Sequence, residues 1–257
     1  MGVLNVTPDS FSDGGRFLDR DAAIAHGLDL VADGADVVDV GGESTRPGAD
    51  DVPADVELGR VIPVVSALSG HVRVSIDTRK AEVAAAAVEA GASLINDVSA
   101  SLWPVAAATG AGWVAMHMRG TPATMQDDPQ YSDVVGEVRD FLEGRAAQAR
   151  ADGVHEIWID PGIGFGKTIE HNLSVLGDLS AIVELGLPVL VGTSRKGFLG
   201  RLMGGAGPDD RLEGSIATAV WAMTQGAAMV RVHDVAATVQ AAALVGDAVP
   251  VEAGMAP

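Results

Sequence analysis

Short apolar runs alternate with longer, alanine-rich amphipathic stretches from one end of the chain to the other. The apolar runs are continuous rather than interrupted by polar residues, as in parallel strands that are buried on both faces. They predict eight strands, at Gly2–Val6, Val37–Val40, Val72–Ile76, Ser93–Ile95, Trp113–Met116, Glu156–Ile159, Val189–Val191 and Met229–Val232. Helical patterns occupy the intervals, for example at Asp21–Asp33, Val56–Leu68, Arg79–Glu89 and Asp133–Arg150.

The number and order of these elements favour one architecture. Eight strand–helix units in 257 residues predict an α/β fold, a single (β/α)8 barrel of the TIM type. No linker, repeat or low-complexity segment divides the sequence, so we expect residues 1–257 to form one domain.

Polar residues stand where the predicted strands end. Five strands end in Asn or Asp and the last carries Arg and His at alternate positions, namely Asn5, Asp39, Asp77, Asn96, Asp160, Arg231 and His233. In a barrel of parallel strands these ends meet at one rim. A single Asp at a strand end usually caps a helix, but capping does not explain six such strands. The pattern predicts a shared active site at the C-terminal rim.

The stretch Ile159–Thr168 shows this pattern most clearly. Asp160 follows a buried strand, Pro161 blocks its continuation, and three glycines follow at alternate positions. Such a loop can approach a ligand closely, and the alternative is a turn with a helix-capping Asp. The final Gly166-Lys167-Thr168 resembles a phosphate-binding loop, but Pro161 stands where that motif requires glycine, so we exclude it.

Composition restricts the class of partner. The formal net charge is -18 and the pI is about 4.5, which argues against nucleic acid and anionic membranes. An anionic substrate therefore needs local cationic side chains or a metal ion. The chain contains no Cys, which excludes disulfides and thiolate chemistry. It shows neither a signal peptide nor a membrane-spanning run, so we expect a soluble, cytoplasmic protein.

The rim side chains suit a flat heterocycle held by its edges. Three carboxylates can accept hydrogen bonds and two amides can both donate and accept, at Asp39, Asp77, Asp160, Asn5 and Asn96. Arg231 and His233 share strand parity and so point the same way, making a small anion site to which Lys196 can add. A phosphorylated heterocyclic substrate would satisfy both groups. The alternative is that Arg231 and His233 are a structural pair buried with Asp234.

Two loops rich in Gly, Pro and Ser follow rim strands, at residues 7–15 and 42–49. Each carries a side chain that is costly to leave unused, Phe11 in the first loop and Arg46 in the second. Long polar loops over a barrel mouth are commonly lids. The alternative is a pair of ordinary surface connections.

Several longer motifs resemble those of one enzyme family. They are Met1–Gly15, Gly41–Ala49, Ser75–Thr78, Ile95–Ser99, Met116–Gly120, Asp160–Lys167, Ser194–Phe198 and Arg231–Val235. In this order, and over essentially the whole chain, they are similar to the motifs of dihydropteroate synthase. The resemblance implies a transferase of folate biosynthesis that condenses 6-hydroxymethyl-7,8-dihydropterin pyrophosphate with p-aminobenzoate to 7,8-dihydropteroate and pyrophosphate. It also implies Mg²⁺ on the pyrophosphate, a homodimer, and a target of sulfonamides.

The resemblance also assigns roles to single residues. The implied pterin pocket comprises Asp77, Asn96, Asp160 and Lys196, with Met116 and Phe165 as apolar walls. The implied pyrophosphate and Mg²⁺ site comprises Asn5, Arg231 and His233, with Asn5 as the metal ligand. The implied p-aminobenzoate region comprises Phe11, Thr45, Arg46, Pro47 and Gly197. The catalytic roles fall to Asp77, Lys196, Arg231, His233 and Arg46. One departure is Ala100, where the family commonly has glycine.

The implied chemistry passes through a cation on the pterin methylene carbon. The electron-rich ring can stabilise that cation, so C–O cleavage can precede attack by the amine. Mg²⁺, Arg231 and His233 would neutralise the leaving pyrophosphate, and Asp77 would stabilise the cation. The aromatic amine is uncharged at neutral pH and needs no strong base. We expect the loops that carry Phe11 and Arg46 to close after the pterin pyrophosphate binds.

Two other functions are compatible with the same fold. A pterin-dependent methyltransferase would share the pocket of Asp77, Asn96 and Asp160, but it would have no use for a pyrophosphate clamp or for the loop with Arg46. A non-catalytic paralogue should have lost rim residues, and none is missing from this sequence.

Overall fold

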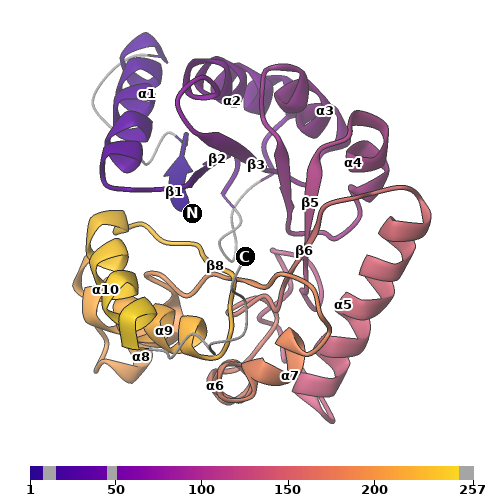
Figure 1. Ribbon diagram of the computed structural model, residues 1–257, viewed down its shortest axis with the longest axis vertical. Coiled ribbons are helices and arrows are strands. Elements are labelled where there is room, and N and C mark those ends of the chain that lie inside the picture. The colour runs from indigo at the N-terminus through magenta and orange to yellow at the C-terminus, as the bar shows by residue number, and fades with distance from the viewer. Residues whose placement is uncertain (8–15, 45–50, 249–257) are drawn as a thin grey trace, which may run out of the picture.

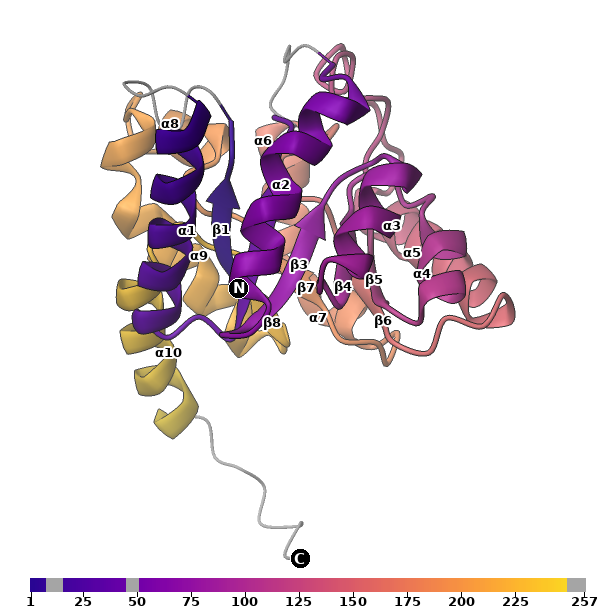
Figure 2. The same cartoon turned by 90° about the horizontal axis from the view of Figure 1, so that it is seen from above.

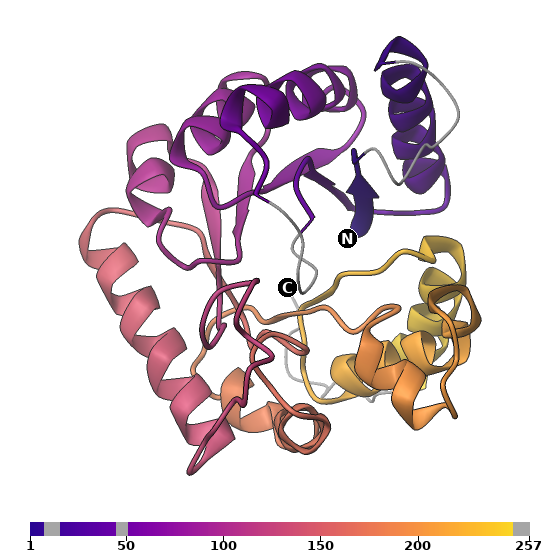
Figure 3. The same cartoon turned by 180° about the vertical axis from the view of Figure 1, so that it is seen from behind.

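The structure, a computed structural model, describes residues 1–7, 16–44 and 51–248. In this part of the chain, strands form an inner layer and helices an outer layer (Figures 1 and 3). The strands are β1 Gly2–Asn5, β2 Val37–Gly41, β3 Arg73–Asp77, β4 Leu94–Asp97, β5 Gly112–Met116, β6 Ile157–Asp160, β7 Leu190–Val191 and β8 Met229–Val230. Each lies within two residues, at either end, of the strand that the sequence predicts.

The strands close into a barrel. β1 to β6 form one sheet in sequence order, and β7 pairs with β8. Single parallel bridges join the two sheets at both seams, from Gly2 to Val232 and from Ile159 to Val189. All strand pairs are parallel, and Figure 2 shows β1 and β3 pointing to the same end of the molecule. The predicted (β/α)8 barrel is confirmed.

Helices cover the outside of the barrel between successive strands (Figure 1). Their bounds are α1 Arg16–Ala32, α2 Ala54–Leu68, α3 Ala81–Glu89, α4 Trp103–Thr109, α5 Val134–Ala151, α6 Ile169–Gly177, α7 Leu179–Val183, α8 Gly197–Leu202, α9 Leu212–Thr224 and α10 Val235–Ala248, with a 3-10 turn at Pro208–Asp210. Within the described segments, no helix is both long enough and apolar enough to span a bilayer.

The interior of the barrel has an apolar plug beneath a polar rim. The plug is a separate hydrophobic cluster of Met1, Val37, Leu94, Val114 and Leu190, with Trp158 and Met229 packed against it. Two residues beyond these apolar residues stand Asp39, Asn96, Met116 and Asp160 on their strands, and Gly192 and Arg231 directly after β7 and β8. Residues two apart on a strand face the same side of a sheet. These rim side chains therefore point into the barrel above the plug.

Candidate active site

A half-buried arginine joins four strand ends at the C-terminal end of the barrel. Arg231, which follows β8, donates from Nε to Asp39 Oδ2 on β2 at 2.6 Å and from Nη2 to Asp77 Oδ2 on β3 at 2.7 Å. Asn96 on β4 donates from Nδ2 to the same Asp39 oxygen at 2.9 Å. The predicted rim residues of these four strands thus form one hydrogen-bonded network.

This network contains two acids for one guanidinium. Burial would lower the pKa of Arg231, but the carboxylates of Asp39 and Asp77 raise it. Burial raises the pKa of Asp77 to about 7, with Arg231 opposing this rise and Asp39 adding to it. Within the described residues, the buried Asp77 Oδ1 has no hydrogen-bond partner. Because buried polar atoms are normally paired, this oxygen is suited to accept from a ligand.

Asp160 faces the same space from the end of β6. Its side chain is 5% exposed, and Oδ1 accepts a hydrogen bond from the Gly162 N–H at 2.7 Å. Burial raises the pKa of Asp160, while Lys196 and the Gly162 hydrogen bond oppose the rise. Gly162 has a φ of +66°, a left-handed conformation in which glycine is favoured. The turn after Pro161 therefore leaves the second carboxylate oxygen for a ligand.

Lys196 reaches the site from the residue that precedes α8. Its Nζ donates to the Ile163 carbonyl and lies 4.7 Å from the centre of the Phe165 ring. Burial lowers the pKa of Lys196 to about 8, with Asp160 acting in the opposite direction. This ammonium is therefore close to its titration point near neutral pH.

These groups line one small cavity in the barrel mouth. Its lining consists of Asp77, Asn96, Val98, Met116, Asp160, Phe165, Gly192, Lys196 and Arg231. Its volume is about 20 Å³, which is room for roughly one water molecule. A bicyclic ring therefore enters only if side chains such as Lys196 or Phe165 move.

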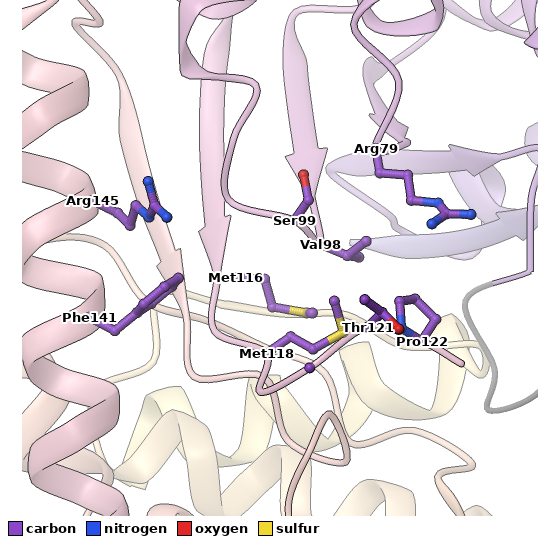
Figure 4. Close-up of a pocket in the computed structure, with 10 residues that line it drawn as sticks. Arg79, Val98, Ser99, Met116, Met118, Thr121, Pro122, Phe141 and Arg145 are labelled. Carbon is purple, nitrogen blue, oxygen red and sulfur yellow. The ribbon is translucent and has the colours of Figure 1, made fainter. Parts of the chain in front are cut away.

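A larger cavity of about 300 Å³ lies beside the first and shares Val98 and Met116 with it. Figure 4 shows Arg145 and Phe141 on one side of it and Arg79 on the other, with Met116 between them. The Arg145 guanidinium lies 5.3 Å from the centre of the Phe141 ring. Val98 and Met116 therefore separate the two cavities. The smaller cavity can expand toward the larger one if these two side chains move.

His233 and Asp234 take different partners from Arg231. His233 Nδ1 lies 3.0 Å from Ser194 Oγ, and the His233 N–H donates to the same hydroxyl at 3.2 Å. Asp234 binds Arg195 with both oxygens, at 2.6 and 3.1 Å. Arg231 is therefore paired with Asp39 and Asp77 rather than with Asp234, whose carboxylate binds a different arginine.

The remaining predicted site residues lie at the mouth or beyond the described segments. Asn5 ends β1, and a Cβ added to Gly41 would be 3.7 Å from both Asn5 Oδ1 and Asp77 Oδ2, so these two oxygens share one opening. Gly197 begins α8 next to Lys196 and is exposed. Phe11, Thr45, Arg46 and Pro47 lie outside the described residues.

Asp39 and Asp97, two acids at strand ends, bind other groups of the protein and do not line the cavity. Asp39 accepts hydrogen bonds from Arg231 and Asn96, which do line it. Asp97 accepts from the N–H groups of Ser101 and Leu102 at 2.6 Å each, just before α4. For Asp97 the ordinary reading of a strand-end acid, a cap on the following turn, is the right one.

Sequence reasoning missed several residues of the site. Val98 and Gly192 line the cavity, and Gly192 could have been found from its parity, two positions after the plug residue Leu190. In the sequence Lys167 stands in an excluded phosphate loop and at the end of the motif Asp160–Lys167, with no role of its own, yet its Nζ is buried 2.8 Å from His117 Nδ1. No sequence signal joins residues 50 positions apart.

Known proteins resemble this chain over nearly its whole length. The family model described as pterin binding enzyme matches residues 1–233. The dihydropteroate synthase of Mycobacterium leprae is 49% identical over 260 residues, covering 96% of this chain and 92% of that protein.

Solved structures agree in fold as well as in sequence. The Yersinia pestis dihydropteroate synthase in a sulfonamide drug complex has a TM-score of 0.91 at 44% identity, covering 96% of this chain and 93% of that one. The Xanthomonas albilineans dihydropteroate synthase with 4-aminobenzoic acid has a TM-score of 0.90 at 48% identity, covering 97% and 93%. The chain belongs to the dihydropteroate synthase family of pterin-binding enzymes.

Proposed function

We propose that this chain condenses 6-hydroxymethyl-7,8-dihydropterin pyrophosphate with p-aminobenzoate, giving 7,8-dihydropteroate and pyrophosphate. The observation that carries the proposal is one cavity with Asp77, Asn96, Asp160 and Lys196 as its polar lining and Met116 and Phe165 among its walls. The names of its relatives and the 4-aminobenzoic acid in the Xanthomonas structure support the same reaction.

The pterin is held by its edges. Asp160 accepts from two neighbouring ring N–H groups, since Gly162 occupies only part of the capacity of Oδ1. Lys196 leaves the Ile163 carbonyl and donates to the ring carbonyl, and its departure enlarges the cavity. Asp77 accepts from the ring through its unpartnered Oδ1.

Pyrophosphate binds toward Arg231, His233 and Asn5. Mg²⁺ is commonly held by one or two protein oxygens, with phosphate oxygens and water completing its shell. No group of three His, Asp or Glu side chains that could hold a metal stands in the described parts of the chain, and the single amide oxygen of Asn5 fits such a sparsely ligated ion. When bound, Mg²⁺ would supply positive charge to the leaving group.

The chain's own residues stabilise charge on both sides of the breaking bond. The C–O bond breaks with its electron pair leaving on pyrophosphate, and the amine nitrogen of p-aminobenzoate then forms the C–N bond and loses a proton. Arg231 stays protonated because Asp39 and Asp77 raise its pKa, so it can balance the phosphate charge. Ionised Asp77 faces the methylene cation. The loops with Phe11 and Arg46 would complete the p-aminobenzoate site.

Purified protein tests this proposal directly. Both substrates and Mg²⁺ should give dihydropteroate, measured by liquid chromatography, and chelation with EDTA should slow its formation. Asp160→Asn should abolish most of the turnover at low pterin concentration, because an amide satisfies only one of two ring N–H donors. Formation of no dihydropteroate by folded wild-type protein would refute the proposed activity.

We also propose that residues 1–257 act as one domain and assemble as a homodimer. In support, α9 and α10 carry exposed apolar side chains at Trp221, Val239 and Leu244, and such side chains on neighbouring helices favour association. Light scattering after size-exclusion chromatography should give twice the chain mass, and Trp221→Glu with Leu244→Glu should give the monomer. A wild-type monomer at micromolar concentration would contradict the dimer.

A further inference from the structure

Lys167 is a buried ammonium next to the pocket that takes no part in the reaction proposed above. Lys167 is only 2% exposed to solvent. Nζ lies 2.8 Å from His117 Nδ1, 3.0 Å from the Gly162 carbonyl oxygen and 3.2 Å from the Phe165 carbonyl oxygen. Within the described residues it forms no salt bridge with a carboxylate.

The three contacts match the three N–H donors of a protonated lysine. The carbonyls of Gly162 and Phe165 can only accept. Burial lowers the pKa of His117 to about 3, and the Lys167 and Arg119 charges act in the same direction. In the neutral tautomer that carries its proton on Nε2, the ring offers the Nδ1 lone pair to Lys167 as the third acceptor. Burying a charge is expensive unless it is fully hydrogen-bonded. Burial lowers the pKa of Lys167 to about 7, with Asp160 acting in the opposite direction, and the direct contacts of Nζ are all to neutral dipoles.

These acceptors connect β5 to the turn that carries the pocket residues. The His117 N–H donates to the Asp160 carbonyl at 2.9 Å, which ties the two strand ends together. A Cβ added to Gly162 would lie 1.8 Å from the His117 carbonyl oxygen, so the turn is pressed against β5. Lys167 strengthens this contact because it binds the carbonyls of Gly162 and Phe165 at the same time.

We propose that the Lys167 ammonium is a positioning residue that locks the turn 161–166 against His117, and thereby sets the places of the Asp160 carboxylate and the Phe165 ring for the pterin. Gly162, which Lys167 holds through its carbonyl, donates its N–H to Asp160 Oδ1. Phe165, held in the same way, places its ring beneath Lys196. The inference rests on the proposed function, because it takes a pterin as the ligand.

A second tether to the same turn provides a matched control. Tyr131 donates its hydroxyl to the Gly166 carbonyl at 2.7 Å, and neither residue lines the cavity. Tyr131→Phe removes a hydrogen bond to the turn without touching Gly162 or Phe165. A purely structural role for Lys167 would make both variants alike in their effect on pterin binding.

Calorimetry with 6-hydroxymethyl-7,8-dihydropterin pyrophosphate measures this difference. Lys167→Met, which keeps length but removes all three donors, should raise the pterin Kd by roughly tenfold or more. The KM for p-aminobenzoate should change by less than about twofold in the enzyme saturated with pterin, and Tyr131→Phe should leave the pterin Kd close to that of wild type. Wild-type pterin affinity in folded Lys167→Met would overturn the inference.

A double-mutant cycle with His117 tests whether the contact is the cause. His117→Phe keeps a ring of similar size but removes the Nδ1 acceptor. Its loss of pterin affinity should be smaller than that of Lys167→Met, and the double variant should bind no more weakly than Lys167→Met alone. If the double variant instead showed the product of the two single losses of pterin affinity, the two residues would act independently, which contradicts the proposed lock.

Chemical rescue separates the charge from the space that the side chain fills. The chain has no Cys, so Lys167→Cys can be alkylated at one site only, in the unfolded state, and then refolded beside wild-type protein taken through the same cycle. 2-Bromoethylamine restores an ammonium and should restore pterin binding, whereas 1-bromopropane should not. Equal rescue by both reagents would mean that packing suffices and would overturn the inference. Failure of the proposed function would appear separately, as absence of dihydropteroate from wild-type protein.

Discussion

The two sides of the proposed pterin pocket hold their buried charges in different ways. On the side of β2, β3 and β8, Arg231 lies between two carboxylates at 2.6 and 2.7 Å. On the side of β5 and β6, Lys167 is held by two carbonyls and a neutral imidazole. The first side depends on opposite charge and the second on dipoles. Removing a charge should therefore destabilise the fold on the first side and misplace the ligand on the second.

The largest expected effect belongs to the ion-paired side. Arg231→Ala leaves Asp39 and Asp77 buried without their counter-charge, and loss of one partner from a buried pair typically costs about 3–5 kcal/mol. Urea unfolding at neutral pH measures this loss. The loss should shrink below pH 7, because burial raises the pKa of Asp77 to about 7 and a protonated Asp77 needs no partner.

A second arginine serves as the control for Arg231. Arg73 binds Glu156 at 2.7 Å at the start of β3, where the two side chains are 33% and 42% exposed. Arg73→Ala should cost less than about 1 kcal/mol, as exposed pairs do. Equal losses for the two variants would show that the buried network adds no stability of its own.

The next effect concerns binding on the side of the turn. Asp160→Asn should weaken binding of the pterin by about 2–4 kcal/mol, because one of two ring donors loses its acceptor. Calorimetry gives the affinity and circular dichroism checks the fold. Asp97→Asn is the matched control, since Asp97 binds the backbone of the turn before α4 and does not line the cavity. Asp97→Asn should lower the free energy of unfolding and leave pterin affinity unchanged. If Asp160→Asn also left pterin affinity unchanged, Asp160 would not belong to the site.

The pH profile of kcat/KM should have an acid limb set by Asp77 and an alkaline limb set by Lys196, which lie on opposite sides of the pocket. Burial raises the pKa of Asp77 to about 7, and activity should fall below that pH because the cation needs an ionised carboxylate. Burial lowers the pKa of Lys196 to about 8, and activity should fall above that pH as the donor is lost. Lys196→Arg should move the alkaline limb upward. An unmoved limb would assign it to another group, such as Lys167, whose pKa burial lowers to about 7.

The smallest expected effect concerns Ala100, in the turn that follows β4. Ala100 is fully buried and has a φ of +49°, in the left-handed region that favours glycine. Ala100→Gly should relieve this strain and raise the free energy of unfolding by about 0.5 kcal/mol, without changing pterin affinity. Thermal unfolding measures the gain. A lower melting temperature would mean that packing of the buried methyl outweighs the backbone strain.

The sequence predicted the ion-paired side better than the turn. Asp77 and Arg231 each follow an apolar run, and parallel strands must bring such ends together. Their mutual contact could not be foreseen, because residues 154 positions apart leave no local signal. Parity predicts one anion site for Arg231 and His233. In the structure Arg231 contacts Asp77 and His233 contacts Ser194, so the shared role stays a prediction. Loop residues such as Arg46 lie outside the described segments, so their placement stays a prediction.

The sequence alone determined the barrel and its polar rim, because buried strands, amphipathic helices and polar residues at strand ends can each be recognised from short stretches of sequence. It also determined that glycine belongs at Gly162, where the turn needs a positive φ. Only the tertiary structure decided which charge meets which partner. Asp97 binds the backbone of the following turn while Asp160 faces the cavity, although both end strands. The reason is that burial and partner choice depend on groups from distant segments, and these set the pKa and the role of each side chain.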